Sequence, residues 1–337
     1  MSIRVGINGF GRMGRLALRL AWTRSGLDIV HVNDPNMPPD IAAHLLEYDS
    51  LHRRWDHEPV ANVDSIFVGD RSFCYSQNKL PGEVQWAKSG VDLVLECSGQ
   101  FRSTETLNAY FDCNVKKVVV SAPVHHGALN VVMGVNQHLY EPNRDRIVTA
   151  ASCTTNCLAP VVKVLHESLR IRHGVITTIH DVTNTQRIVD QSHTDARRAR
   201  SSLLSLIPTS TGSAKAIGLI YPELQGKVSG IAVRAPVLNS SLTDCVFEVE
   251  KATDADAVNY LLEAGTRRPE LDGILGFSKK PLVSIDFQGD SRSSIVDGPS
   301  TMVVDGTLVK VLAWYDGEYG YVSRLIELAE WIGKDLV

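Results

Sequence analysis

The chain has 337 residues, of which 44% are hydrophobic and 21% are charged, with a formal net charge of -4. This length predicts about two domains, and the slight negative charge argues against a nucleic-acid partner or a membrane-surface partner. No run of about 18 apolar residues is present to span a membrane. The six scattered cysteines and the lack of a signal-peptide pattern predict free thiols and a cytoplasmic protein.

The first 34 residues predict a βαβ unit that binds a dinucleotide. An alternating strand over 3–7 is followed by Gly-Phe-Gly-Arg-Met-Gly at 9–14, a leucine-rich helix and an apolar strand over 29–32. In this motif the first glycine permits a tight turn, the second lets the backbone approach a pyrophosphate, and the third lets helix and strand pack closely. The cofactor residues expected from the motif are Gly9, Gly11, Arg12, Met13 and Gly14.

An acidic residue follows the second strand of this unit. Asp34 comes 20 residues after Gly14, where an acid commonly binds the adenosine ribose. Its charge would repel a 2′-phosphate, so the sequence favours NAD over NADP. The alternative is a plain turn residue before Pro35.

Two further buried strands are predicted over 92–97 and 117–121, joined by a helix over 104–111. Small residues stand at the ends of both strands. Because the carboxyl ends of parallel strands line the ligand crevice of an α/β sheet, we expect Ser98, Gly99 and Ser121 to contact the cofactor. Ordinary turn chemistry is the alternative for each residue.

A cysteine stands where a strand passes into a helix near the middle of the chain. Residues 146–149 predict the strand, and helical spacing over 158–169 predicts the helix. Free N–H groups and the helix dipole favour a thiolate at Cys153, which makes it a candidate nucleophile. Cys157 shares a helix face with Cys153, but no second Cys or His pair with zinc-like spacing follows. We therefore expect a buried, inert Cys157 and no metal site, with a metal pair and a strained disulfide as alternatives.

A histidine ends the next predicted strand, over 175–179. His180 lies 27 residues after Cys153 and is a candidate general base for the thiol. A long polar loop over 181–205 follows, in which Arg200 is a candidate for binding an anionic substrate.

Two more anion-binding features are predicted beyond this loop. Arg234 ends a later strand and can contact an anion. Thr211 and Gly212 precede a helix over 213–219, and a helix N-terminus attracts anions. A simple helix cap is the alternative at 211–212.

Strands dominate the remainder of the chain, and a helix follows at the C-terminus. The strands are predicted over 228–234, 242–249, 282–287, 301–304 and 308–314. Asp305 and Gly306 predict a hairpin turn between the last two strands. Parallel βα units followed by hairpins predict an α/β Rossmann dinucleotide-binding domain and then an α+β catalytic domain with a mainly antiparallel sheet. The expected boundaries are 1–152 and 153–318, with the helix over 319–337 packed back on the first domain.

Two segments carry a close resemblance to a known family. Residues 6–15 are Gly-Ile-Asn-Gly-Phe-Gly-Arg-Met-Gly-Arg, and residues 151–160 are Ala-Ser-Cys-Thr-Thr-Asn-Cys-Leu-Ala-Pro. Together they resemble the phosphorylating glyceraldehyde-3-phosphate dehydrogenases, and the chain looks similar to copies found with arsenic-resistance genes. Shorter matches at 48–50, 121–123, 208–212, 233–236 and 314–316 extend the resemblance over essentially the whole chain.

The resemblance implies a reaction of glycolysis. Cys153 attacks the aldehyde of D-glyceraldehyde 3-phosphate, His180 takes the proton, hydride leaves to NAD, and phosphate releases the thioester as 1,3-bisphosphoglycerate. Loop 181–205 resembles the S-loop that lies at a subunit interface in the family, which implies a homotetramer. The residues implied to bind the substrate and the attacking phosphate are Ser152, Thr154, Thr183, Arg200, Thr211, Gly212 and Arg234.

One position departs from the family pattern near the cofactor. Gly317 stands where the family usually has an Asn that hydrogen-bonds the nicotinamide amide, so we expect Gly317 beside the cofactor without that bond. Ser192 replaces a Pro that often helps to exclude NADP, which leaves NAD preference mainly to Asp34.

Three alternative functions remain open from the sequence. Arsenate in place of phosphate would give 1-arseno-3-phosphoglycerate, as arsenic resistance would require. An erythrose-4-phosphate dehydrogenase would typically lack the Thr at 183 and the Thr-Gly at 211–212, and both are present here. An NAD-binding thiol sensor is favoured only by Gly317 and is opposed by the intact set around Cys153.

Overall fold

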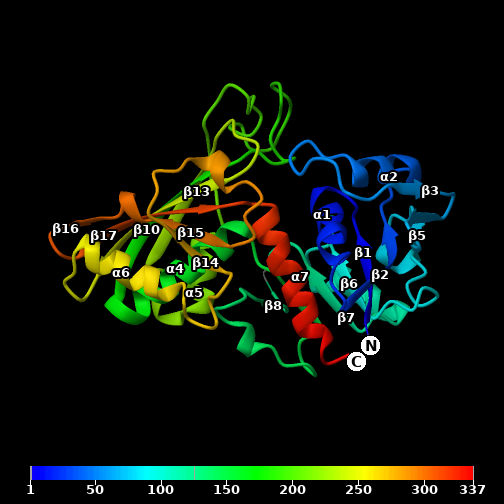
Figure 1. Ribbon diagram of the computed structural model, residues 1–337, viewed down its shortest axis with the longest axis horizontal. Coiled ribbons are helices and arrows are strands. Elements are labelled where there is room, and N and C mark those ends of the chain that lie inside the picture. Colours follow the sequence, from blue (N-terminus) through cyan, green and yellow to red (C-terminus); the bar gives the residue numbers. More distant parts are fainter. Residues whose placement is uncertain (1, 125, 337) are drawn as a thin grey trace. The chain divides into compact units, whose positions relative to one another are not determined.

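The computed structural model describes residues 2–124 and 126–336, which divide into two units (Figure 1). The first unit holds the chain up to Met133, Gln137–Ser152 and the stretch from Val322 onward. The second holds Gly134–Asn136 and Cys153–Tyr321. No helix within these described residues is long and apolar enough to cross a membrane.

The first unit is built on a sheet whose centre is parallel. Strands β1, β2, β5, β6, β7, β8 and β9 pair in parallel, and β3 and β4 form an antiparallel hairpin at the edge. Central strands such as β6 and β7 are buried at every position, as parallel strands covered on both faces must be. In sheet order the strands are β3 (Pro59–Ala61), β4 (Ser65–Val68), β5 (Arg71–Ser76), β2 (Leu27–Asn33), β1 (Ile3–Asn8), β6 (Leu93–Glu96), β7 (Lys117–Val120), β9 (Ile147–Thr149) and β8 (Leu129–Asn130).

Helices of the first unit follow the strands along the chain. They are α1 (Arg12–Ala21), α2 (Pro39–Glu47), α3 (Thr104–Leu107) and most of α7 (Tyr319–Gly333), with 3-10 turns η1 (Pro81–Glu83), η2 (Asn108–Cys113) and η3 (Gln137–Leu139). Helix α7 is tied to this unit by an ion pair of 3.2 Å between Glu330 and Arg24. Gly333 lies so close to Ile3 that a Cβ would be 1.9 Å from the isoleucine Cδ1.

The second unit contains a mainly antiparallel sheet. Two of its pairs, β10 with β12 and β14 with β15, are parallel, and the others are antiparallel. In sheet order the strands are β11 (Ile207–Ser210), β12 (Val228–Arg234), β10 (Ile171–His180), β13 (Ser241–Val249), β17 (Leu308–Tyr315), β15 (Ser294–Asp297) and β14 (Leu275–Ser278), and β16 (Met302–Val304) pairs with β17. The predicted fold class is therefore confirmed.

One face of this second sheet is covered by helices. Helix α4 (Cys153–Leu169) packs on β10, β13, β15 and β17, while α5 (Ser213–Ile220) packs on β12 and α6 (Ala255–Gly265) on β14 (Figure 1). Strand β13 shows the consequence, because its residues alternate between fully buried and partly exposed. The remaining 3-10 turns are η4 (Pro222–Leu224), η5 (Ser284–Phe287) and η6 (Gly298–Ser300).

The strand predicted over 282–287 is wrong. That stretch forms the 3-10 turn η5, in which Asp286 accepts a hydrogen bond of 2.9 Å from the Val283 N–H. Val283 and Ile285 are exposed, and only Phe287 turns inward, where it stacks on Trp314. The alternation of apolar residues therefore arose without a sheet. Strands β14 and β15 and helix α6 were not predicted, whereas the hairpin turn is confirmed, with positive φ at both Asp305 and Gly306.

Candidate active site

The glycine motif of the first unit forms a tight turn between β1 and α1. Gly9 has a φ of +90°, and a Cβ on it would lie 2.4 Å from the Ser98 backbone. A Cβ on Gly14 would lie 2.1 Å from the Gly9 carbonyl oxygen, so the helix packs directly on the turn. The Asp34 carboxylate accepts a hydrogen bond of 2.8 Å from the Phe10 N–H and so holds the turn from the neighbouring strand. Sequence reasoning gave Asp34 a ribose role and missed this structural one.

Gly11, by contrast, faces open space at the N-terminus of α1. A Cβ at Gly11 would have no neighbouring atom within 4 Å, and no side chain caps this helix end. Free N–H groups at a helix N-terminus attract a pyrophosphate, so the turn fits a dinucleotide. The Arg12 guanidinium forms a two-point ion pair with Asp49, at 2.5 and 3.1 Å, and this pairing orients the side chain beside the turn. Met13 occupies the first turn of the same helix.

The small residues predicted at the strand ends lie at the carboxyl edge of the first sheet. Ser98 donates a hydrogen bond of 2.5 Å to the buried Glu96 carboxylate, and Gly99 adopts a φ of +70° with open space beside it. The Ser121 N–H bonds the Glu96 carbonyl. Burial raises the pKa of Glu96, although hydrogen bonds from Asn8, Ser98 and Tyr110 oppose that effect.

Cys153 is the first residue of α4 and follows a strained bend. Strand β9 ends at Thr149, and Ala151 then adopts a left-handed φ of +53°, which is costly for a residue with a Cβ. The Ala151 N–H is held by the Thr149 hydroxyl at 3.0 Å. Ser152 is partly exposed and directly precedes the helix. This bend puts the Cys153 side chain at the helix N-terminus, where the dipole favours an anion.

Cys157, one turn later, lies in a different environment. It is fully buried, with its sulfur 3.6 Å from the Ser294 hydroxyl, and burial raises the pKa of its thiol to about 12. The predicted burial of Cys157 is confirmed. All six cysteines are free thiols. Within the described residues, no group of three or more His, Cys, Asp or Glu side chains is arranged to hold a metal.

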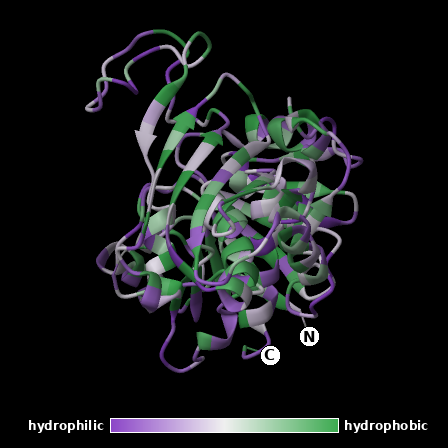
Figure 2. Ribbon diagram, turned by 90° about the vertical axis from the view of Figure 1, so that its left-hand side faces the viewer, coloured by the Kyte–Doolittle hydropathy of each residue, from purple (hydrophilic) through white to green (hydrophobic). Residues whose placement is uncertain are grey.

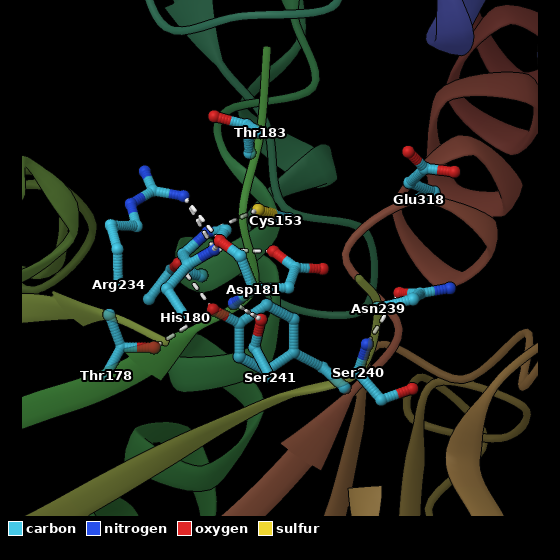
Figure 3. Close-up of polar contacts among 12 residues, drawn as sticks. Cys153, Thr178, His180, Asp181, Thr183, Arg234, Asn239, Ser240, Ser241 and Glu318 are labelled. Atoms are coloured by element: carbon cyan, nitrogen blue, oxygen red, sulfur yellow. Dashed lines mark hydrogen bonds and ion pairs between the residues drawn. The ribbon is translucent and has the colours of Figure 1, made fainter. Parts of the chain in front are cut away.

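Strand pairing brings the chemistry of the second unit together. Strands β10 and β12 are parallel, and their register sets His180 directly opposite Arg234 at the same edge of the sheet. The His180 Nε2 is 3.6 Å from the Cys153 Sγ, which confirms that the two residues meet (Figure 3). The other ring nitrogen, Nδ1, is 2.8 Å from an Arg234 guanidinium nitrogen.

Asp181, which sequence reasoning treated only as the start of a loop, also contacts the histidine. Its carboxylate Oδ1 lies 2.6 Å from the His180 Nδ1, and both side chains are buried. Burial of the ring favours its neutral form, but hydrogen bonds to Asp181 and Cys153 outweigh burial and raise the pKa of His180 to about 9. The Asp181 carboxylate therefore favours the protonated form of the ring that faces Cys153.

Tyr315 contacts the His180 ring and two threonines beside it. Its hydroxyl is 2.8 Å from the Thr154 hydroxyl and 3.0 Å from the Thr178 hydroxyl, and its ring meets the His180 ring edge to face. Thr154 is itself buried. Thr154 was predicted to bind the substrate, and in the structure its hydroxyl is hydrogen-bonded to Tyr315.

Two arginines of loop 181–205 lie in different surroundings. The Arg200 Nε pairs with Asp190 at 2.8 Å, and both side chains are exposed. Arg198 is less exposed, and its charge, after the larger effect of burial, lowers the pKa of Arg234. Arg200, the predicted substrate residue, is thus an exposed side chain that is paired with Asp190.

The remaining predicted residues lie on the second unit as well. The Thr183 hydroxyl is bonded to Thr185 and Gln186 in an exposed turn. Thr211 bonds the Ser213 N–H at 3.3 Å, and Gly212 precedes α5 with open space beside it. Gly317 lies over Asp181, so that a Cβ there would be 3.3 Å from the Asp181 Oδ2.

Two family models match the chain. The NAD-binding domain of glyceraldehyde 3-phosphate dehydrogenase matches residues 3–104, and the C-terminal domain of that enzyme matches residues 152–317. The chain belongs to the glyceraldehyde-3-phosphate dehydrogenase family. Its relatives in the family are similar over nearly their whole length. A glyceraldehyde-3-phosphate dehydrogenase 3 of Nostoc sp. is 58% identical over 336 residues, which is 100% of both chains. The glyceraldehyde-3-phosphate dehydrogenases of Geobacillus stearothermophilus and Pseudomonas aeruginosa are 45% and 46% identical, over 99% and 98% of both chains.

Proposed function

We propose that this chain catalyses the NAD-dependent oxidative phosphorylation of D-glyceraldehyde 3-phosphate to 1,3-bisphosphoglycerate. The observation that carries the proposal is the approach of the His180 Nε2 to the Cys153 Sγ, at 3.6 Å, at the start of helix α4. A cysteine nucleophile beside a histidine is the arrangement that thioester chemistry requires. Membership of the family supplies the substrate class and the cofactor.

The side chains of the second unit divide the reaction between them. The His180 Nε2 takes the thiol proton of Cys153, the sulfur attacks the aldehyde carbon, and the same nitrogen gives that proton to the oxygen, which forms a thiohemiacetal. Bound NAD would accept the hydride from that carbon. The Nε2 takes back the hydroxyl proton as the thioester forms. A phosphate oxygen then attacks the thioester carbon, and Cys153 leaves as a thiolate beside the His180 cation and the N-terminus of α4.

NAD fits the turn of the first unit. The pyrophosphate would lie at the α1 N-terminus, where Gly11 leaves the backbone open. Asp34 would accept hydrogen bonds from the adenosine ribose with the lone pairs that remain beyond its bonds to Phe10 and Asn36. Ser98, Gly99 and Ser121, at the carboxyl edge of the same sheet, complete the proposed cofactor set.

Anions of the substrate would be bound by arginine, hydroxyl and backbone groups of the second unit. The buried Nε of Arg234 has no hydrogen-bond partner among the described residues, so it is available to a phosphate. We propose Arg234, Arg200 and Thr183 for the substrate phosphate. Ser152, Thr211 and the N–H groups around Gly212 are proposed for the attacking phosphate.

The test follows NADH formation from glyceraldehyde 3-phosphate and NAD without an oxyanion, with phosphate and with arsenate. Continuous turnover that needs phosphate supports the proposal, and the ratio of the two oxyanion rates decides whether arsenate is the preferred acceptor. A single stoichiometric burst in all three mixtures would refute phosphorolysis. The absence of a burst with glyceraldehyde 3-phosphate, together with a reaction of erythrose 4-phosphate, would make erythrose 4-phosphate the substrate. No burst with either sugar would favour a thiol sensor.

We also propose that the chain assembles as a homotetramer. Loop 181–205 and the residue after it carry apolar side chains that are mostly solvent-exposed: Ile188, Val189, Leu203, Leu204 and Leu206. Figure 2 shows hydrophobic stretches in this part of the chain. Contiguous exposed apolar surface commonly marks a protein interface. Light scattering is expected to give four times the 37.0 kDa chain mass, and Leu204→Asp is expected to reduce it.

We also propose the domain boundaries and the cellular location of the enzyme. Residues 1–152 with the C-terminal helix would form the NAD-binding domain, and residues 153–318 would form the catalytic domain. The six free thiols suit a reducing compartment, which supports a cytoplasmic enzyme.

A further inference from the structure

A buried carboxylate lies directly behind the histidine of the Cys153 site. Asp181 is 4% exposed, and its Oδ1 is 2.6 Å from the His180 Nδ1, on the side of the ring away from the sulfur (Figure 3). Its backbone is anchored, because its N–H donates a hydrogen bond of 3.0 Å to the Ser241 hydroxyl on β13. The proposed reaction uses Cys153 and His180 and leaves this carboxylate without a role.

Three groups lie within hydrogen-bond distance of the same ring nitrogen: an Arg234 nitrogen, the Asp181 carboxylate and the Asp181 carbonyl oxygen. Arg234 approaches the His180 Nδ1 at 2.8 Å and can only donate to it, which requires an unprotonated Nδ1. In a neutral ring that arrangement leaves the proton on Nε2, where it blocks the base facing Cys153. The Asp181 carboxylate can only accept, so it requires the proton on Nδ1. The carboxylate, together with the Asp181 carbonyl oxygen at 2.9 Å from the same nitrogen, therefore selects the tautomer whose Nε2 lone pair faces the sulfur, and in the cation the carboxylate stabilises the positive charge.

The space for this carboxylate is provided by a glycine. A Cβ on Gly317 would lie 3.3 Å from the Asp181 Oδ2 and 3.7 Å from the Oδ1. The first of these distances is shorter than ordinary van der Waals contact, so any larger side chain at position 317 would press on the carboxylate. Gly317 has no positive φ, so its backbone would accept another residue. Gly317 therefore matters because its missing side chain leaves space for Asp181, and not because of its backbone conformation.

We propose that Asp181 is a positioning residue that orients His180 and fixes its tautomer, and that Gly317 is the residue that admits its carboxylate. This proposal rests on the proposed function of Cys153 and His180. It replaces the cofactor contact expected at Gly317 with a structural role on the histidine side of the site. The charged or titratable groups that face the His180 ring are Cys153 on α4, Asp181 after β10, Arg234 on β12 and Tyr315 on β17.

The test compares Asp181→Asn and Asp181→Ala with the wild-type chain. Alkylation of Cys153 by iodoacetamide is followed against pH, and the His180 ring is titrated by NMR. Loss of the carboxylate is expected to lower the His180 titration midpoint by at least about one pH unit, because burial of the ring then dominates. The rate of the NADH burst is expected to fall about tenfold or more, with the KM for the sugar phosphate little changed. Asp272→Asn, an exposed carboxylate in the same unit, is the matched control.

A double-mutant cycle tests the part played by Gly317. Gly317→Ala alone is expected to slow the burst and lower the His180 midpoint, because the added methyl displaces the carboxylate. In the Asp181→Ala background the same change is expected to have no further effect, since the group it displaces is gone. Additive effects would refute the proposed link between the two positions. Asp181→Asn keeps the side-chain shape and so serves if Asp181→Ala does not fold.

Failure of this proposal is distinguishable from failure of the proposed function. Alkylation and NMR titration need neither substrate nor NAD, so they report on Asp181 even if the sugar phosphate is inert. An unchanged His180 midpoint and an unchanged alkylation profile in both Asp181 variants would overturn the positioning role. A wild-type chain without an NADH burst would overturn the reaction and leave that result standing.

Discussion

Replacing Gly9 and Gly11 one at a time by alanine should have different consequences, a loss of stability for Gly9 and a loss of NAD affinity for Gly11. Gly9→Ala places a Cβ at a φ of +90° and 2.4 Å from the Ser98 backbone, which cannot swing aside as a side chain can. A left-handed conformation costs about 1–2 kcal/mol, and overpacking costs about 1–3 kcal/mol more. A total of about 3 kcal/mol lowers the melting temperature of a unit of this size by roughly 10 °C.

Gly11→Ala tests the same turn without the clash. The Cβ would meet no atom within 4 Å, so the only cost to stability is that alanine is a poorer N-cap residue than glycine, which amounts to about 1 kcal/mol. Its methyl would instead occupy the space where the pyrophosphate approaches the backbone, and NAD affinity should fall about tenfold or more.

Thermal unfolding without NAD and a fluorescence titration with NAD measure the two effects separately. Gly9→Ala is expected to lower the melting temperature strongly, whereas Gly11→Ala is expected to lower it only slightly and to weaken NAD binding. A Gly9→Ala chain that melts like the wild type would refute the steric argument. Wild-type NAD affinity in Gly11→Ala would move the pyrophosphate away from this helix end.

Three further predictions follow from single groups. The pKa of His180 is raised from 6.5 to about 9, so its protonation stabilises the fold fully below about pH 6.5, and the stabilisation is lost as the pH rises through 9. Urea unfolding across that range should show this pH dependence in the wild type and in the exposed control His173→Asn, but not in His180→Asn. The NADH burst of His180→Asn should also be greatly slowed. A near-normal burst from that variant would exclude His180 as the base. Iodoacetamide should modify Cys153 long before Cys157, whose pKa is about 12, and equal rates by mass spectrometry would contradict the assignment. Asp34→Gly should relax the preference for NAD over NADP, and an unchanged ratio of affinities would argue against the ribose contact.

Local pattern predicted much of the site correctly. The glycine turn, the cysteine at the start of α4 and the histidine at the end of β10 each depend on residues close in sequence, so their motifs carried the information. Helix α6 was missed although Asp254 caps it with a hydrogen bond of 2.8 Å to the Ala257 N–H. That signal was present in the sequence and went unused. The 282–287 stretch shows the opposite error, because alternating apolar residues there remain exposed.

The sequence by itself determined the nucleophile, its histidine partner and the dinucleotide turn, since these follow from residue type at strand and helix ends. Tertiary structure alone decided which groups surround them. The parallel register of β10 and β12 sets Arg234 beside His180, and the fold brings Gly317 over Asp181, 136 positions away along the chain. Such contacts depend on strand pairing and on the path of loops between distant segments, and no local periodicity encodes them.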